Sequence, residues 1–104
     1  MKEVNVNELK KMLDAKEDFQ LIDVREEHEA DIASIGGELI PMGDVMDNLD
    51  KISKEKKLVV YCRSGNRSGV IVQTLESQGF KNVYNLKGGI TAWAKEVDPT
   101  MATY

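Results

Sequence analysis

Short apolar runs alternate along this chain with segments whose apolar residues have helical spacing. The runs have the length of strands and cover residues 19–24, 38–40, 58–61 and 82–85. Helices are predicted between and around them at residues 5–15, 26–32, 42–52, 68–78 and 89–96. Strands that alternate with helices form a parallel sheet covered on both faces. The pattern therefore predicts an α/β fold of three layers, α/β/α, around a central parallel sheet of about five strands.

Cys62 is the only cysteine of the chain and follows directly on the predicted strand at residues 58–61. The polar loop after it leads into the helical pattern of residues 68–78, which stops before Gly79, a residue typical of helix ends. In parallel α/β sheets the ligand crevice lies outside the carboxyl ends of the strands. Cys62 is therefore expected at the mouth of that crevice, in a loop that joins a strand to the N-terminus of a helix.

The chemistry of this loop favours an anion. Backbone N–H groups at a helix N-terminus have no intrahelical partners, and the helix dipole adds partial positive charge there. With Arg63 and Arg67 beside it, the Cys62 thiolate is favoured over the thiol, which lowers the pKa of this side chain. We therefore expect Cys62 to be a nucleophile that meets an anionic substrate. The alternative, a buried inert thiol, does not explain the polar residues of the loop.

The loop sequence Cys-Arg-Ser-Gly-Asn-Arg-Ser at residues 62–68 resembles the active-site loop of rhodanese-type sulfurtransferases. Further similarity to this family lies at residues 21–26, 39–41 and 88–93, in the family's order. Residues 93–104 resemble the end of rhodanese domains that follow adenylyltransferase domains in sulfur-carrier pathways. The resemblance implies a single rhodanese domain over residues 1–104, with the three-layer rhodanese-like fold.

The resemblance also implies a reaction. Cys62 would take up sulfane sulfur as a persulfide from thiosulfate or another persulfide donor and pass it to a thiophilic acceptor. The acceptor would be cyanide in an assay, and a thiol, thioredoxin or a sulfur-carrier protein in the cell. The covalent persulfide makes a separate cofactor unnecessary. The substrate-binding residues would be those of the loop: Arg63, Ser64, Gly65, Asn66, Arg67 and Ser68.

Two other functions share this loop type and remain open. Related cysteine phosphatases use Cys-x5-Arg, whereas Cys62 and Arg67 form the shorter Cys-x4-Arg, which favours sulfur over a tetrahedral phosphate. The shorter spacing therefore disfavours both a phosphatase and an arsenate reductase. A phosphatase also needs a general acid, and no such residue is obvious near the loop. Non-catalytic interaction modules with this fold are disfavoured by the intact cysteine and complete loop.

Individual polar residues have narrower expected roles. Asp23 and Arg25 end a strand and are interpreted either as outer residues that brace the loop or as a strand-end turn with a surface salt bridge. Ser64 and Ser68 are expected to form local hydrogen bonds and to cap the helix. Asn66 is expected to support the loop by adopting a left-handed conformation.

Composition excludes several classes of protein. With one cysteine and one histidine in 104 residues, neither a disulfide nor a metal-ligand cluster is expected, and a reactive thiol points to the cytoplasm. No transmembrane segment or signal peptide is predicted.

The charge is distributed unevenly along the chain. Residues 1–52 carry 6 basic and 14 acidic side chains, net −8, whereas residues 53–104 carry 8 basic and 4 acidic side chains, net +4. The reactive loop lies in the positive half, which favours an anionic donor or acidic partner; the scattered bases do not indicate nucleic-acid binding.

Overall fold

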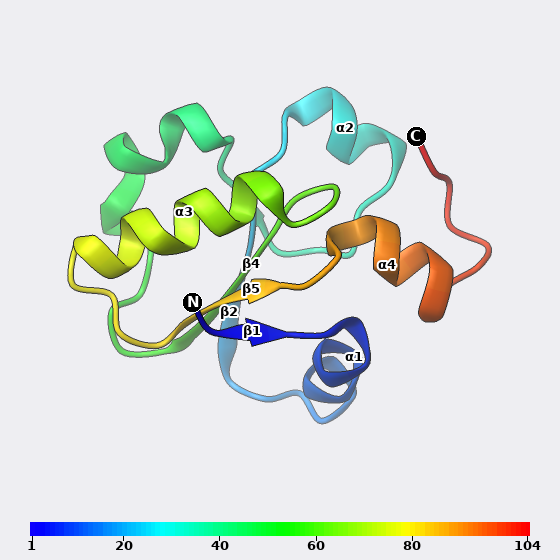
Figure 1. The fold of residues 1–104 in the computed structure, drawn as a ribbon, viewed down its shortest axis with the longest axis horizontal. Helices are drawn as coiled ribbons and strands as arrows, with labels where there is room; N and C mark the ends of the chain where they lie inside the picture. Colours follow the sequence, from blue (N-terminus) through cyan, green and yellow to red (C-terminus); the bar gives the residue numbers. More distant parts are fainter.

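A computed structural model describes all residues from Met1 to Tyr104, and its centre is a parallel sheet of five strands (Figure 1). The strands lie in the order β1-β5-β4-β2-β3, and every neighbouring pair is parallel. Their bounds are β1 Glu3–Val4, β2 Phe19–Asp23, β3 Glu38–Leu39, β4 Lys57–Tyr61 and β5 Val83–Leu86. The predicted α/β class and parallel sheet are confirmed, and β1 is the strand that the apolar pattern did not indicate.

The helices lie close to their predicted positions: α1 Val6–Asp14, α2 Glu27–Ile32, η1 Met42–Lys51, α3 Asn66–Ser77 and α4 Gly89–Glu96. At the start of α1, the Asn5 side chain accepts the Glu8 backbone N–H at 2.8 Å, and the Glu8 carboxylate accepts the Asn5 N–H at 2.9 Å. This capping box satisfies two N–H groups that the helix leaves unpaired. The segment η1 is a 3₁₀ helix with a kink at Asn48, where the pattern had predicted a helix without distinguishing its type.

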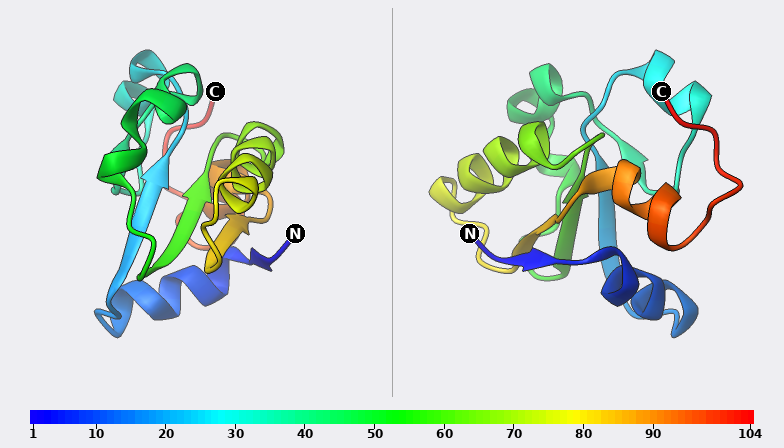
Figure 2. Two further views of the ribbon diagram at one scale, coloured as in Figure 1. Left: turned by 90° about the vertical axis from the view of Figure 1, so that its left-hand side faces the viewer. Right: turned by 45° about the vertical axis from the view of Figure 1, so that its right-hand side comes forward.

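Side chains alternate between the two faces of the sheet and form two apolar clusters. On one face, Ile22, Val60 and Cys62 pack with α3 and η1. On the other, Val59 and Tyr61 pack with α1 and α4. Figure 2 shows the sheet between these helices. Because Cys62 continues the alternation of β4, its side chain lies on the face covered by α3.

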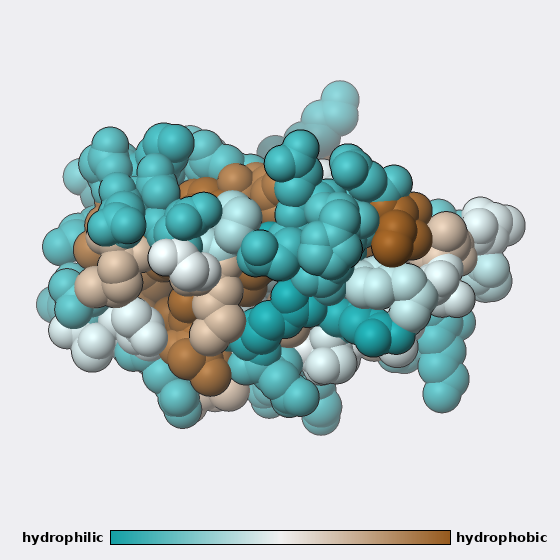
Figure 3. Space-filling model, turned by 90° about the horizontal axis from the view of Figure 1, so that it is seen from above, coloured by the Kyte–Doolittle hydropathy of each residue, from teal (hydrophilic) through white to brown (hydrophobic).

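The register of the strands brings the site residues to one end of the sheet. Asp23 pairs with Tyr61 across β2 and β4, so the end of β2 lies beside the residue that precedes Cys62. Both strands point upward in Figure 2, and Figure 3 looks down on this end, where hydrophilic side chains surround smaller apolar areas. No helix of the structure is both long and apolar enough to cross a membrane.

Candidate active site

The Cys62 side chain is buried at the end of β4 and accepts hydrogen bonds from the loop that follows. Its Sγ atom lies 3.1 Å from the Gly65 amide nitrogen, 3.4 Å from the Ser68 amide nitrogen and 3.3 Å from Ser68 Oγ. Burial alone raises the pKa of the thiol, but the donors from Ser68, Gly65 and Ser64 outweigh it and lower the pKa of Cys62 below its ordinary value. The site therefore stabilises a thiolate.

The loop turns at Gly65, which is the N-cap of α3 and has φ +104°. A residue with a side chain rarely adopts this conformation, so glycine is required by the turn. Asn66 is the first residue of α3 and has no positive φ, so the predicted left-handed conformation at Asn66 is wrong. The capping role expected for Ser64 and Ser68 is also wrong, because the N-cap is Gly65 and the Ser68 hydroxyl faces Cys62 and Asn85.

Asn85 of β5 links the loop to the sheet. Its Nδ2 donates to the Gly65 carbonyl at 3.1 Å, which turns Oδ1 toward Ser68 Oγ at 2.5 Å. The Ser68 hydroxyl has one proton and therefore bonds either Asn85 or Cys62 at a given moment. A thiolate at Cys62 competes for this proton, while a thiol leaves it with Asn85.

We expect Ser68→Ala to raise the pKa of Cys62, because it removes the hydroxyl donor and leaves the backbone donors in place. Competition from Asn85 limits the loss to about one hydrogen bond, so alkylation of Cys62 at neutral pH should slow about fivefold. The measurement is the alkylation rate against pH. Ser77→Ala, which removes a hydroxyl bonded to the Thr74 carbonyl at the far end of α3, is the control. An unchanged pH profile in Ser68→Ala would contradict this role.

The N-terminus of α4 holds the backbone of the loop that carries Cys62. The Ile90 amide donates to the Cys62 carbonyl and the Thr91 amide to the Arg63 carbonyl, each at 3.0 Å. Gly89 permits this approach, because a Cβ atom there would lie 2.5 Å from both carbonyl oxygens. The φ of +58° at Gly89 also favours glycine.

We therefore expect Gly89→Ala to reduce the free energy of unfolding by about 2 kcal/mol, through overpacking and backbone strain. Urea denaturation measures the loss. Gly43→Ala is the matched control, since a Cβ atom at Gly43 meets nothing within 4 Å and its φ is not positive. Equal stability of the two variants would show that the contact between α4 and the loop is not tight.

The two loop arginines have different surroundings. Arg67 forms a bidentate ion pair with Glu29 of α2, with nitrogen–oxygen distances of 2.6 and 2.8 Å. Hydrogen bonds from Arg67 lower the pKa of Glu29 to about 2, and the carboxylate in turn raises the pKa of Arg67. Arg63 is exposed and belongs to none of the ion pairs. Arg63 therefore provides the uncompensated positive charge of the loop.

Asp23 and Arg25 form a buried ion pair behind the loop. Arg25 Nε and Nη2 donate to the two carboxylate oxygens of Asp23 at 2.9 and 2.8 Å. The pair does not lie on the surface, because Arg25 has no exposed area and Asp23 is 2% exposed. Arg25 Nη1 also donates to the hydroxyl of Tyr104 at 3.0 Å, and that hydroxyl donates to Glu29 at 2.9 Å. The pair thus connects with Arg67 through Tyr104 and Glu29; its bracing role stays a prediction.

Three residues of this arrangement were not predicted from the sequence: Glu29, Asn85 and Tyr104. Asn85 could have been identified from the sequence as a candidate site residue, since it is a polar residue near the end of an otherwise apolar strand. Glu29 is one of several acids in α2, and nothing in the local pattern distinguishes it. Trp93 lies in the core with 7% of its surface exposed, which agrees with packing rather than substrate contact.

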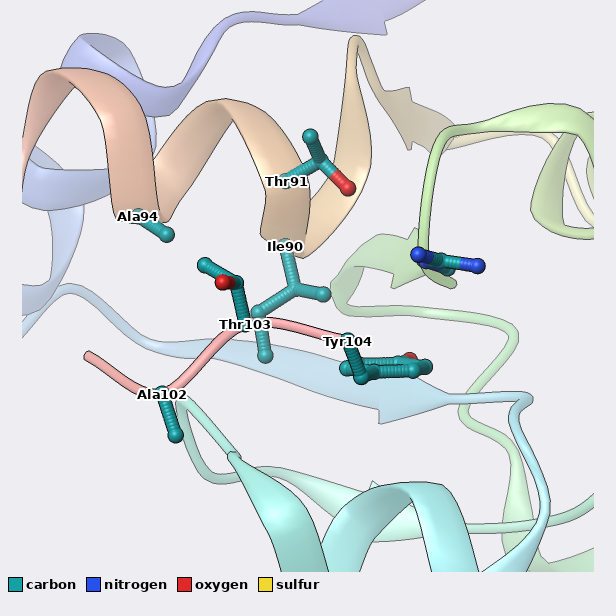
Figure 4. Close-up of a pocket in the computed structure, with 7 residues that line it drawn as sticks. Ile90, Thr91, Ala94, Ala102, Thr103 and Tyr104 are labelled. Carbon is teal, nitrogen blue, oxygen red and sulfur yellow. The ribbon is translucent and has the colours of Figure 1, made fainter.

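A cavity of about 80 Å³ adjoins the loop between α4 and the C-terminal segment. Its lining comprises Arg63, Ile90, Thr91, Ala94, Ala102, Thr103 and Tyr104. Figure 4 shows Ile90 and Thr91 on the helix that faces the segment carrying Thr103 and Tyr104. A second, open cavity of about 420 Å³ includes Phe19 and Lys56, at the opposite end of the strands from Cys62. The first cavity is therefore the one associated with the reactive loop.

These features define a class of protein: a parallel α/β domain with a buried cysteine at a strand end, whose sulfur accepts hydrogen bonds from the loop that begins the next helix. A model of the family described as "Rhodanese-like domain" matches residues 5–96. The chain belongs to the rhodanese-like domain family, as the resemblance in residues 62–68 implied.

Similar proteins support this assignment over most of the chain. The putative sulfurtransferase YtwF of Bacillus subtilis is 40% identical over 95% of this chain and 96% of its own length. The rhodanese-like/PpiC domain-containing protein 12 of Arabidopsis thaliana is 42% identical over the whole chain, which spans 38% of that protein. The probable adenylyltransferase/sulfurtransferase MoeZ of Mycobacterium tuberculosis is 36% identical over 97% of the chain and 26% of its own length, which confirms the resemblance to such proteins.

Solved structures show the same fold. The rhodanese-like domain protein of Staphylococcus aureus has a TM-score of 0.85 and 34% identity, covering 93% of this chain and 95% of its own. The human single-domain sulfurtransferase TSTD1 has a TM-score of 0.83 and 25% identity, covering 92% of this chain and 97% of its own. The three-layer rhodanese fold expected from the sequence is thus confirmed.

Proposed function

We propose that this protein is a sulfurtransferase that carries sulfane sulfur as a persulfide on Cys62. The observation that supports this most directly is the Cys62 Sγ atom, buried at the end of β4 with three donors between 3.1 and 3.4 Å. The lowered pKa of Cys62 increases the share of the thiolate at a given pH. Two relatives named as sulfurtransferases or putative sulfurtransferases match nearly their whole length to this chain, which favours the same activity here.

The proposed reaction has two steps. The Cys62 thiolate attacks the outer sulfur of thiosulfate; a new sulfur–sulfur bond forms, the old one breaks, and sulfite leaves with the bonding electrons. The negative charge then lies on the outer persulfide sulfur, which needs donors such as the free amides of the loop. An acceptor thiolate or cyanide next attacks that sulfur, and the Cys62 thiolate departs with the bonding electrons. This is ping-pong chemistry without a separate cofactor.

The remaining loop residues have supporting roles in this proposal. Arg63 attracts the anionic donor, because its charge is not compensated by a carboxylate. Arg67 holds the loop against α2 through Glu29. Ser64, Gly65, Asn66 and Ser68 shape the cradle that surrounds the sulfur. Candidate acceptors are a small thiol, thioredoxin or a sulfur-carrier protein, the last suggested by the similarity to MoeZ. A reducing cytoplasm suits the single reactive thiol.

Intact mass after incubation with thiosulfate tests the proposal. We expect a gain of one sulfur atom on the protein, and cyanide should remove it and release thiocyanate. A parallel assay with an aryl phosphate tests the alternative of a phosphatase. Phosphate release without a sulfur adduct would overturn the proposal, and the absence of both activities would favour an interaction module.

A further inference from the structure

Tyr104 contacts Arg63 through its ring and both Arg25 and Glu29 through its hydroxyl. Its ring centroid lies 4.6 Å from Cζ of Arg63, within the range of a cation–π interaction. Its hydroxyl accepts from Arg25 at 3.0 Å and donates to Glu29 at 2.9 Å. The hydroxyl is thus fixed by two buried residues, while the ring is presented to an exposed one.

The hydroxyl of Tyr104 is held between two ion pairs. Arg25 is held by both carboxylate oxygens of Asp23, and Glu29 is held by both terminal nitrogens of Arg67. The hydroxyl lies between these two ion pairs and bonds each of them. A tyrosine whose hydroxyl is anchored in this way has little freedom to swing its ring away from this place. In Figure 4 the ring of Tyr104 lies at the border of the cavity beside α4.

Arg63 has no comparable restraint apart from this ring. It is exposed, it is in none of the ion pairs, and an arginine side chain free in solvent samples many rotamers. Its charge attracts an anion to Cys62 effectively only when it is held near the loop. The position of the Tyr104 ring therefore decides where the uncompensated charge lies.

We infer that Tyr104 is a positioning residue that holds the Arg63 guanidinium beside the catalytic loop, where it captures an anionic sulfur donor. The identity of the donor rests on the proposed function, whereas the contact between Tyr104 and Arg63 is independent of it. The ring supplies the contact with Arg63, and the hydroxyl supplies the anchor.

A cycle of variants tests whether Tyr104 acts through Arg63. We expect Tyr104→Leu to raise the KM for thiosulfate about fivefold, with kcat changed less than about twofold. Arg63→Gln should raise KM by at least as much, and adding Tyr104→Leu to it should have no further effect. Tyr104→Phe keeps the ring but removes the anchoring hydroxyl, so it should raise KM by an intermediate amount. Tyr84→Leu is the control, because the Tyr84 ring stacks on Lys2 and Lys57 instead of an arginine of the loop.

A second readout does not depend on sulfur transfer. Iodoacetate and iodoacetamide alkylate the same thiolate, but only iodoacetate is an anion, so the ratio of their rates reports positive charge near Cys62. Tyr104→Leu should lower this ratio severalfold in the wild-type background and not in the Arg63→Gln background. An unchanged ratio and KM in Tyr104→Leu, or an equal loss in both backgrounds, would overturn the inference. A lowered ratio in a protein that gains no sulfur would instead reject the proposed function alone.

Discussion

Cys62→Ser is expected to abolish sulfur uptake from thiosulfate while leaving the fold intact. The loop donors lower the pKa of the Cys62 thiol and so favour the thiolate, but a serine hydroxyl stays protonated near neutral pH. A neutral hydroxyl is a poor nucleophile toward sulfur, so the rate should fall at least about 10³-fold. The serine oxygen can still accept from Gly65 and Ser68, so the free energy of unfolding should change by less than about 1 kcal/mol.

Intact mass and urea denaturation measure these two effects on the same samples. The matched comparison is Ser68→Ala, which should load sulfur more slowly and still reach full occupancy, because the nucleophile is present. A sulfur adduct on Cys62→Ser would mean that another side chain carries the sulfur. Loss of folding in Cys62→Ser would mean that the loop depends on the thiolate for its shape.

The local parts of the fold and of the site follow from the sequence because their causes are local. The helix predicted from residue 5 begins within one residue of α1, whose capping box between Asn5 and Glu8 depends only on its first turn. The position of Cys62 depends on an apolar strand followed by a helical pattern, and both are recognisable over a few residues. The terminal helix Gly89–Glu96 is found at its predicted bounds for the same reason.

The features of the fold and site that could not be predicted from the sequence depend on contacts between residues far apart along the chain. Arg67 and Glu29 are 38 residues apart, and Tyr104 and Glu29 are 75 apart, so no local periodicity relates them. The strand Glu3–Val4 has two residues, too few for an alternating pattern, and exists because β5 offers it a partner. Asn66 and Gly65 both tolerate a left-handed turn, and the start of α3 decides that Gly65 adopts it.

Asp23→Asn is expected to reduce the free energy of unfolding by about 3–5 kcal/mol. The change keeps the shape of the side chain but removes the charge that compensates the buried Arg25 guanidinium. Urea denaturation at neutral pH measures the loss. Asp14→Asn is the matched control, since it breaks the exposed pair with Lys10 and should cost no more than about 0.5 kcal/mol. A similar small loss in Asp23→Asn would show that the buried pair contributes little.

A paired replacement tests whether this ion pair braces the loop or serves folding alone. Asp23→Leu with Arg25→Met removes both charges, and apolar side chains in place of a buried pair often restore stability. The same change removes the donor that anchors the Tyr104 hydroxyl. If the pair braces the loop through Tyr104 and Glu29, sulfur loading should stay about tenfold slower than in the wild type even where stability recovers. Recovery of both stability and loading would instead assign Asp23 and Arg25 to folding alone, because the catalytic loop would then keep its geometry without them.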